Sequence, residues 1–240
     1  MNKKRNYYFV NYVDPDTTKD AKFLQTKELV NLLRDTLNEY LSLGRFSRFD
    51  FTDNNKIQFF NENFEVSIRI INREINLLTL QDVIQLNQDA QSLFEEDGIY
   101  GVSELKDRGI VETALNNIGK NSVVFGQDQF PTISKKAAHL WFKLARYQAF
   151  NNGNKRTALI ATLNFLENNN YYVDYKKLNL DRNYFYKVSK LIANDKWNEQ
   201  DIQTFLLKVC RLGIRRNNDG RQIIGKSNNK LIFWRNSKIR

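Results

Sequence analysis

The first seventy residues combine one helical pattern with two strand patterns. From Leu24 to Tyr40 the apolar residues recur every three or four positions, which predicts a helix with one buried face. Lys56–Phe60 and Phe64–Ile71 are rich in β-branched and aromatic residues on either side of a polar turn, which predicts two strands. A small α+β unit is therefore expected, either as a nucleic-acid-binding fragment or as a docking or oligomerisation layer.

From Thr79 onwards the apolar spacing is helical. Thr79 and Asp82 have the spacing of a capping box, in which each side chain accepts a hydrogen bond from the other's backbone. Asn198 is a good N-cap for the last predicted helix, and Gly213 is expected to be its C-cap glycine. After the helix that Thr79 opens, helices are predicted at residues 109–118, 133–149, 155–168, 182–194 and 199–212.

These patterns predict a mainly α protein in three parts. Residues 1–73 form the α+β extension, residues 74–212 an all-helical domain and residues 213–240 a tail. The chain is 41% hydrophobic, enough to bury a core, and its two prolines and ten glycines are few for a sandwich of many short strands. No apolar run approaches the roughly 18–20 residues of a membrane span, so we expect a cytoplasmic protein without membrane contact.

The net charge of +10 is concentrated at the C-terminal end. Residues 211–240 contain nine Lys and Arg and one Asp, whereas residues 74–210 contain sixteen of each sign. Basic and apolar residues mix in this tail, so it is expected to form a short β-hairpin. Such a hairpin would bind nucleic acid through phosphates and stacked bases, or would pack on the body as a solvated element.

The chain has one histidine, His139, and one cysteine, Cys210. This composition excludes an internal disulfide, a Cys/His zinc site and any metal motif with two histidines. A Ser-His-Asp or Cys-His mechanism would have to use His139. The single cysteine is typical of a protein from a reducing compartment.

The most informative segment is the loop at residues 148–156. A helix is expected to end near Ala149 and a new one to begin at Lys155, whose start is a natural anion site. Gly153 would allow a close approach to a ligand. Lys155 and Arg156 place positive charge where the helix dipole disfavours it, which indicates a polyphosphate ligand. The alternative is an ordinary turn with solvated cations.

The string FNNGNKRTALIATLNFLENNNY at residues 150–171 resembles the core motif of the Fic/Doc family, H-x-F-x-[D/E/N]-[G/A]-N-[K/G]-R. It is similar to the death-on-curing (Doc) branch, and LKDRGIVETALNN and FGQDQFPTISKKAAHLWFKLAR extend the likeness over about residues 75–210. The resemblance implies an all-helical domain that binds ATP and transfers AMP or, in the Doc branch, a phosphoryl group to a protein hydroxyl such as that of a translation elongation factor. It also implies a toxin controlled by an antitoxin.

The resemblance assigns a role to each residue of the loop. Phe150 would anchor the loop in the core, and Gly153 and Asn154 would contribute an anion nest, with Asn154 also bracing the loop. Lys155 and Arg156 would bind phosphates, with Arg156 on the charge that develops during transfer. Asn151 belongs to the same phosphate-binding set, and residues 119–130 would be the flap that aligns a protein target by strand-like pairing.

Two positions depart from the family pattern. Gln148 stands where the family has a histidine that acts as general base, and an amide cannot take that role; a loss on the order of 10²–10⁴ in rate is expected. Asn152 stands where an acidic residue often holds Mg²⁺, and its neutral oxygen is a weaker ligand. His139 is nine residues before Gln148, about 13.5 Å along a helix axis, and it lies within the AAHLW stripe, so it is expected to be a core or groove histidine. Asp128 in the flap is the other candidate for a substitute base.

Three hypotheses follow from the sequence. The first is a working Doc-like kinase or AMP transferase in which Gln148 orients the target hydroxyl. The second is a pseudoenzyme that binds ATP or a partner. The third is a regulator that binds nucleic acid through its N-terminal unit and basic tail.

Overall fold

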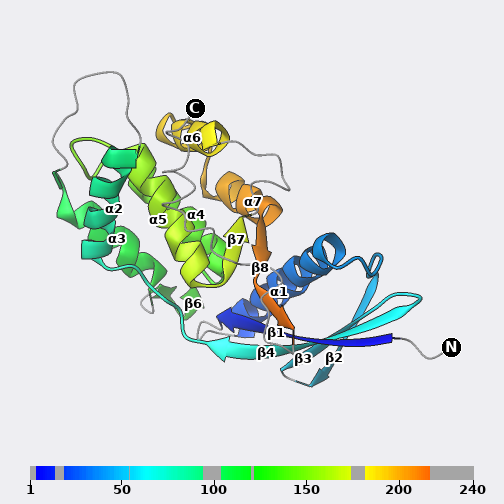
Figure 1. Ribbon diagram of the computed structural model, residues 1–240. Coiled ribbons are helices and arrows are strands. Elements are labelled where there is room, and N and C mark those ends of the chain that lie inside the picture. Colours follow the sequence, from blue (N-terminus) through cyan, green and yellow to red (C-terminus); the bar gives the residue numbers. More distant parts are fainter. Residues whose placement is uncertain are drawn as a thin grey trace, which may run out of the picture.

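The computed structural model describes residues 4–13, 19–53, 55–93, 104–119, 122–173 and 182–216 (Figure 1). The helices are α1 (Lys19–Tyr40), α2 (Leu80–Leu93), α3 (Arg108–Ile118), α4 (Ile133–Arg146), α5 (Asn154–Asn168), α6 (Arg182–Ala193) and α7 (Glu199–Val209). The strands are β1 (Lys4–Val13), β2 (Arg48–Asp53), β3 (Lys56–Phe60), β4 (Phe64–Arg73), β5 (Val123–Val124), β6 (Gln127–Asp128), β7 (Tyr171–Val173), β8 (Cys210–Leu212) and β9 (Ile214–Arg216).

The N-terminal unit is a five-stranded sheet covered on one face by α1. The strand order is β2-β3-β4-β1-β9; β1 runs parallel to β4 and antiparallel to β9. Every second residue of the inner strands is buried, as shown by Val10 of β1 and Ile68 of β4, and α1 contributes a buried stripe that includes Leu33 and Leu37. The predicted helix and both predicted strands are confirmed, as parts of a larger sheet than the pattern indicated.

The prediction of a mainly α protein is wrong. About half of the described residues are helical and about a quarter lie in strands, so the fold is α+β. The sequence pattern does not reveal β1 and β2, because their outward positions carry aromatic or charged side chains instead of a simple polar alternation. It also does not reveal β9, whose partner β1 is about two hundred residues away in the chain.

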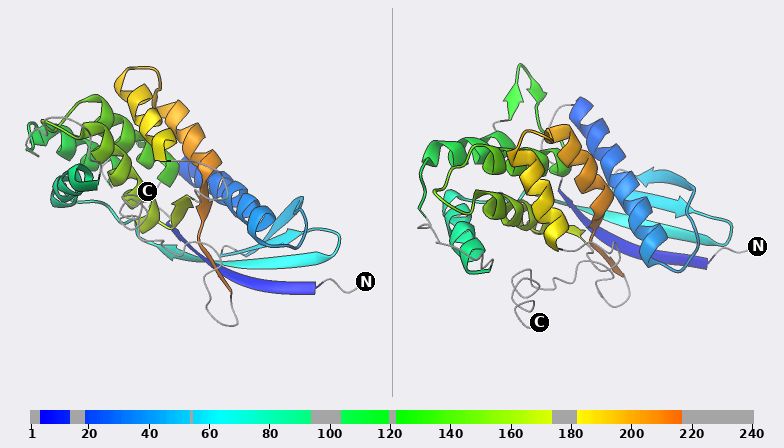
Figure 2. Two further views of the ribbon diagram at one scale, coloured as in Figure 1. Left: turned by 45° about the horizontal axis from the view of Figure 1, so that its top comes forward. Right: turned by 90° about the horizontal axis from the view of Figure 1, so that it is seen from above.

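The helical domain is built around α4 and α5, which pack against each other while α2, α3, α6 and α7 surround them (Figure 2). Ten of the fourteen residues of α4 are buried, among them Trp141, whose indole N–H donates to the Ser189 hydroxyl at 2.9 Å. The capping box of Thr79 and Asp82 is confirmed at the start of α2. Across the described residues, no helix has both the length and the apolar character needed to cross a membrane.

Two predicted helix ends are wrong. α4 ends at Arg146 and not at Ala149, and α7 ends at Val209, where Cys210 becomes the C-cap and the chain turns into β8. Gly213 is therefore no helix cap. It separates β8 from β9, and a Cβ there would lie 2.4 Å from Oδ1 of Asn170. Only glycine fits this approach. Residues 217–240 of the predicted tail hairpin lie outside the described residues.

The N-terminal unit is joined to the helical domain by the buried carboxyl group of Glu28 on α1. Glu28 accepts hydrogen bonds from the Ser134 hydroxyl at 2.6 Å and the Ser134 backbone N–H at 3.3 Å, in the first turn of α4. The Tyr171 hydroxyl of β7 donates to the same carboxyl at 2.9 Å. Burial raises the pKa of Glu28, although its hydrogen bonds oppose the rise. The group therefore keeps its proton to a higher pH in the folded chain than in the unfolded one.

We expect Glu28→Gln to match the unaltered protein in stability below about pH 4.5 and to exceed it at pH 7, by about 1 kcal/mol. Above that pH the unfolded chain releases the Glu28 proton while the folded chain retains it, so the free energy of unfolding of the unaltered protein falls as pH rises. Urea unfolding at pH 4 and pH 7 measures both proteins. Glu28→Ala should lose about 3 kcal/mol at either pH, because the donors of Ser134 and Tyr171 lose their acceptor. Equal slopes with pH for the Gln variant and the unaltered protein would contradict the assignment.

Candidate functional site

The loop at residues 148–156, hereafter the motif loop, connects α4 to α5 through two left-handed backbone positions. Gln148 has φ of 52° and Gly153 has φ of 77°. Phe150 is buried between them with 3% of its surface exposed, so it anchors the loop in the core as predicted. The two turns bring the chain back over this anchor and start α5 at Asn154.

The Asn154 side chain holds the motif loop closed. The Phe150 backbone N–H donates to Asn154 Oδ1 at 2.8 Å, and Asn154 Nδ2 donates to the Phe150 carbonyl at 2.7 Å. One amide thus satisfies both backbone groups of one residue, which fixes the loop relative to the helix start. The predicted bracing by Asn154 is confirmed, and it uses both polar atoms of that side chain.

The residues before α3 provide a second support for the motif loop. Leu105 forms an antiparallel bridge with Phe150, and the Ala149 carbonyl accepts from the Lys106 and Asp107 N–H groups at 2.8 and 3.0 Å. The Asn151 backbone N–H donates to the Glu104 carbonyl at 3.0 Å, and the Asn151 side chain donates to Glu104 Oε2 at 3.2 Å. The structure therefore places Asn151, predicted to bind phosphate, in contact with Glu104.

Asn87 of α2 is a site residue that the sequence analysis missed. Its buried Nδ2 donates to the Asn152 carbonyl at 2.9 Å and to the Thr157 hydroxyl at 2.8 Å, and that hydroxyl donates to the Gly153 carbonyl at 3.0 Å. The signal in the sequence was its position between Val83 and Ala90 on the apolar stripe of α2. A polar residue on such a stripe requires buried partners.

The start of α5 is a candidate anion site. Gly153 is the N-cap, and no side chain caps the helix. The first N–H groups of an α-helix have no acceptor within the helix, so they and the dipole favour an anion. Lys155 is half-buried and Arg156 is buried in this first turn. The arrangement is suited to a phosphate group, with neutral amides holding the backbone and two cations beside it.

The segment predicted as the flap, residues 119–130, contains a β-hairpin. β5 and β6 pair antiparallel around a turn at Phe125, whose side chain is fully exposed. The stem of the hairpin is held by Asp128, which accepts from the Ser122 hydroxyl at 2.7 Å and the Phe130 N–H at 2.8 Å. A short strand pair with free edges and an apolar tip is suited to pairing with an extended peptide.

The helices and loop that form this site coincide with a known family domain. Residues 77–166 match the model of the Fic/DOC family. These residues are a Fic/DOC family domain. The match contains α2, α3, the hairpin of β5 and β6, α4, the motif loop and most of α5, and it leaves out the N-terminal sheet, α6 and α7. No curated protein matches the chain.

Within the Fic/DOC domain, the only histidine of the chain lies away from solvent and has two partners. His139 is 3% exposed; its Nε2 is 3.1 Å from Asn117 Nδ2 and its Nδ1 is 3.0 Å from Glu199 Oε1. The Phe130 ring packs on it with 4.1 Å between centroids. The prediction of a core or groove histidine is confirmed, so His139 does not replace the motif histidine. Gln148 itself is exposed.

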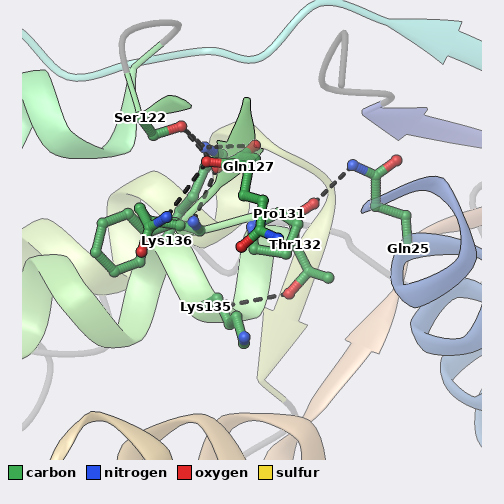
Figure 3. A network of polar contacts seen from close by, with 10 residues as sticks. Gln25, Ser122, Gln127, Pro131, Thr132, Lys135 and Lys136 are labelled. Atoms are coloured by element: carbon green, nitrogen blue, oxygen red, sulfur yellow. Dashed lines mark hydrogen bonds and ion pairs between the residues drawn. The ribbon is translucent and has the colours of Figure 1, made fainter. Parts of the chain in front are cut away.

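Asp128, the other candidate base, is also engaged. Its side chain is 2% exposed, and its Oδ2 lies 3.9 Å from Nζ of the buried Lys136. Burial lowers the pKa of Lys136, and the charge of Asp128 opposes that shift. The same stem is tied to α1 by Gln25, whose Nε2 donates to the Pro131 carbonyl at 2.6 Å (Figure 3). The Asp128 carboxyl group is thus taken up by contacts within the hairpin stem and with Lys136.

The described donor set fits a polyphosphate better than a metal ion. Asn152 Oδ1, predicted as the Mg²⁺ ligand, accepts the Gly153 N–H at 2.7 Å and carries no charge. Among the described residues, no group of three or more His, Cys, Asp or Glu side chains is placed to hold a metal. A magnesium ion at this loop would depend on oxygens of the nucleotide for most of its ligands.

We expect Asn154→Ala to release the motif loop without unfolding the domain. Loss of the two hydrogen bonds to Phe150 should cost about 2 kcal/mol, and the Phe150 amide should exchange its hydrogen faster. Hydrogen exchange read by mass spectrometry, together with urea unfolding, measures both effects. Asn164→Ala is the matched control, because its side chain donates one hydrogen bond to the Ile160 carbonyl within the same helix. Unchanged exchange at residues 149–153 in Asn154→Ala would refute the clamp.

Proposed function

We propose that the Fic/DOC domain binds ATP with its phosphates at the start of α5. The observation that carries this proposal is the uncapped N-terminus of α5, held in place by Asn154 and Asn87 and flanked by Lys155 and Arg156. Positive charge in the first turn destabilises an isolated helix, so a bound anion would remove a cost that the free protein carries. Family membership of the domain supports ATP as that anion.

We further propose that the bound nucleotide donates a phosphoryl or AMP group to a protein hydroxyl that the flap aligns. The resemblance of the motif to the Doc branch favours phosphoryl transfer and suggests a translation factor as target and an antitoxin as regulator. A phosphoryl transition state is loose and depends on positioning and charge stabilisation more than on a base. In this mechanism Gln148 orients the hydroxyl and Arg156 stabilises the charge on the transferred group, while the proton leaves to solvent.

One observation favours a second function, a pseudoenzyme that binds nucleotide without transfer. Gln148 has no titratable proton, His139 is paired with Asn117 and Glu199, and Asp128 is buried at the flap stem. Neither His139 nor Asp128 is therefore available as a base at the motif loop. In this case the phosphate site would report ATP to a partner protein.

We expect Lys155→Ala to weaken ATP binding about tenfold in isothermal titration calorimetry, because one charge-assisted contact to phosphate is lost. Arg156→Lys should weaken binding similarly, because it keeps the charge but loses the planar pair of donors. Lys208→Ala is the control for Lys155→Ala, because it removes one exposed positive charge from α7, away from the motif loop. If all variants bind as the unaltered protein does, ATP does not bind at this loop.

The two functions are separated by transfer from labelled ATP. The unaltered protein and Gln148→His are incubated with cell lysate and either α- or γ-labelled ATP. A transferase labels a protein from one of them, and we expect Gln148→His to accelerate labelling on the order of 10²-fold or more. Label from γ-labelled ATP alone identifies a kinase, and label from α-labelled ATP identifies an AMP transferase. Absence of label with both proteins, combined with measured ATP binding, would establish the pseudoenzyme.

A further inference from the structure

The N-terminal sheet has one face that no described helix covers. In Figures 1 and 2, α1 lies on one side of the sheet, and the other side carries no helix among the described residues. Side chains alternate between the two faces of a strand. We refer to the uncovered side as the open face. It holds the odd-numbered residues 5–11 of β1 and 65–69 of β4, the even-numbered residues 56–60 of β3, and Arg215 of β9.

A row of three cations and one aromatic ring crosses the open face. Phe9 of β1 is paired with Arg215 of β9 on one side and with Arg69 of β4 on the other, and Arg69 is paired with Lys56 of β3. Adjacent strands lie about 4.8 Å apart, so the row spans roughly 15 Å. Its cations are spaced closely enough to meet successive phosphates of one strand.

The described residues offset the charge of this row only in part: Asp53 of β2 lies opposite Lys56 in the sheet register and lines the same hollow as Lys56 and Arg69. Like charges directly opposite each other on neighbouring strands destabilise a sheet. Arg69 of β4 and Lys56 of β3 are such a pair. No described carboxylate forms an ion pair with Lys56, Arg69 or Arg215, whereas Arg5 on the same face has Glu65 at 3.5 Å. An anionic ligand would offset this cost.

Aromatic rings stand beside the cations. Tyr7 is 45% exposed and Phe9 is partly exposed, and they are two residues apart on β1, so their side chains leave the same face about 6.6 Å apart. Both line a hollow of about 700 Å³ together with Lys56, Ser67 and Arg69. Nucleic-acid bases stack on such rings while the backbone follows the cations.

We propose that the open face binds single-stranded nucleic acid, with bases on Tyr7 and Phe9 and phosphates on Arg215, Arg69 and Lys56. An acidic peptide would satisfy the charge but offers no regular series of flat rings for the aromatic side chains. A second copy of this chain, with net charge +10, would bring the same sign of charge to the row. Single-stranded nucleic acid supplies both the phosphates and the rings.

The chain that follows the sheet supports the same ligand. β9 lies at the edge of the sheet, and the sequence that follows it, residues 217–240, contains six Lys or Arg and one Asp. A basic segment is disfavoured as an occupant of a basic face, but it adds attraction for a phosphate backbone close to it. The open face and the motif loop belong to different units of the chain, so this inference does not depend on ATP transfer.

Fluorescence anisotropy of the full chain with labelled 12-nucleotide RNA and DNA of mixed sequence tests the proposal. Stacking and phosphate contacts do not involve the sugar, so the two affinities should agree within about threefold. The combined variant Lys56→Gln/Arg69→Gln should bind at least tenfold more weakly and reduce the slope of log K against log salt by about 1.4, which corresponds to two lost phosphate contacts. Tyr7→Ala should weaken binding about tenfold through lost stacking.

Matched controls separate the open face from charge in general. Lys187→Gln/Lys196→Gln removes two exposed cations at and after α6, and Tyr184→Ala removes an exposed ring of α6. Both should bind within twofold of the unaltered protein, and circular dichroism checks that every variant is folded. Arg235→Gln/Lys238→Gln tests the tail and should weaken binding less than the open-face variant does.

Several results would each overturn the proposal. The first is no binding of either oligonucleotide at 50 mM salt, and the second is an equal loss of affinity in the open-face and control variants. The third is a loss of affinity in Arg235→Gln/Lys238→Gln with none in the open-face variant. The fourth is a dimer, detected by light scattering, that the open-face substitutions dissociate. The last result would assign the face to a second copy of the chain. Strong preference for a duplex of the same sequence would also contradict stacking on Tyr7 and Phe9.

Discussion

The buried carboxyl group of Glu28 holds the two units of this protein together. It reaches the first turn of α4 through Ser134 and the edge of β7 through Tyr171, so a single side chain of α1 touches both halves of the helical core. One turn earlier on α1, Gln25 binds the Pro131 carbonyl at the end of the flap. The helix that covers the sheet therefore also fixes the flap stem and the start of α4, and burial keeps its carboxyl group protonated to a higher pH than in the unfolded chain.

The motif loop is held almost entirely by neutral groups. Asn154 closes it, Asn87 supports it from α2 and backbone bonds from residues 104–107 brace its outer side. The charged groups near the proposed anion site are the cations of the first turn of α5 and the Glu104 carboxylate, which accepts a hydrogen bond from the Asn151 side chain. The bonds from Asn154, Asn87 and residues 104–107 do not use the Gln148 side chain, so the loop can take this shape whether or not that position carries a base. The proposed phosphate binding and the proposed proton transfer therefore depend on different residues.

The C-terminal chain unites the sheet and the helices. After α7, β8 pairs with β7 of the helical domain and β9 pairs with β1 of the N-terminal sheet, with only Gly213 between them. A sheet whose last strand comes from the far end of the chain is not a separable appendage. The N-terminal sheet, which carries the open face, and the helical domain, which carries the motif loop, are thus held together by Glu28, by Gln25 and by the β8–β9 connection, among other contacts.

The sequence by itself determined the elements with local signals. The capping box at Thr79, the helical stripes and the loop from Phe150 to Arg156 were predicted near their true positions, because spacing, caps and helix starts depend on neighbouring residues. Only the tertiary structure decided what depends on distant partners. It paired β9 with β1, turned the expected C-cap Gly213 into a crossing point beside Asn170, and placed Asn87 under the motif loop. It also placed Asp128 and His139 in buried contacts, because burial and hydrogen-bond partners are set by packing between segments far apart in the chain.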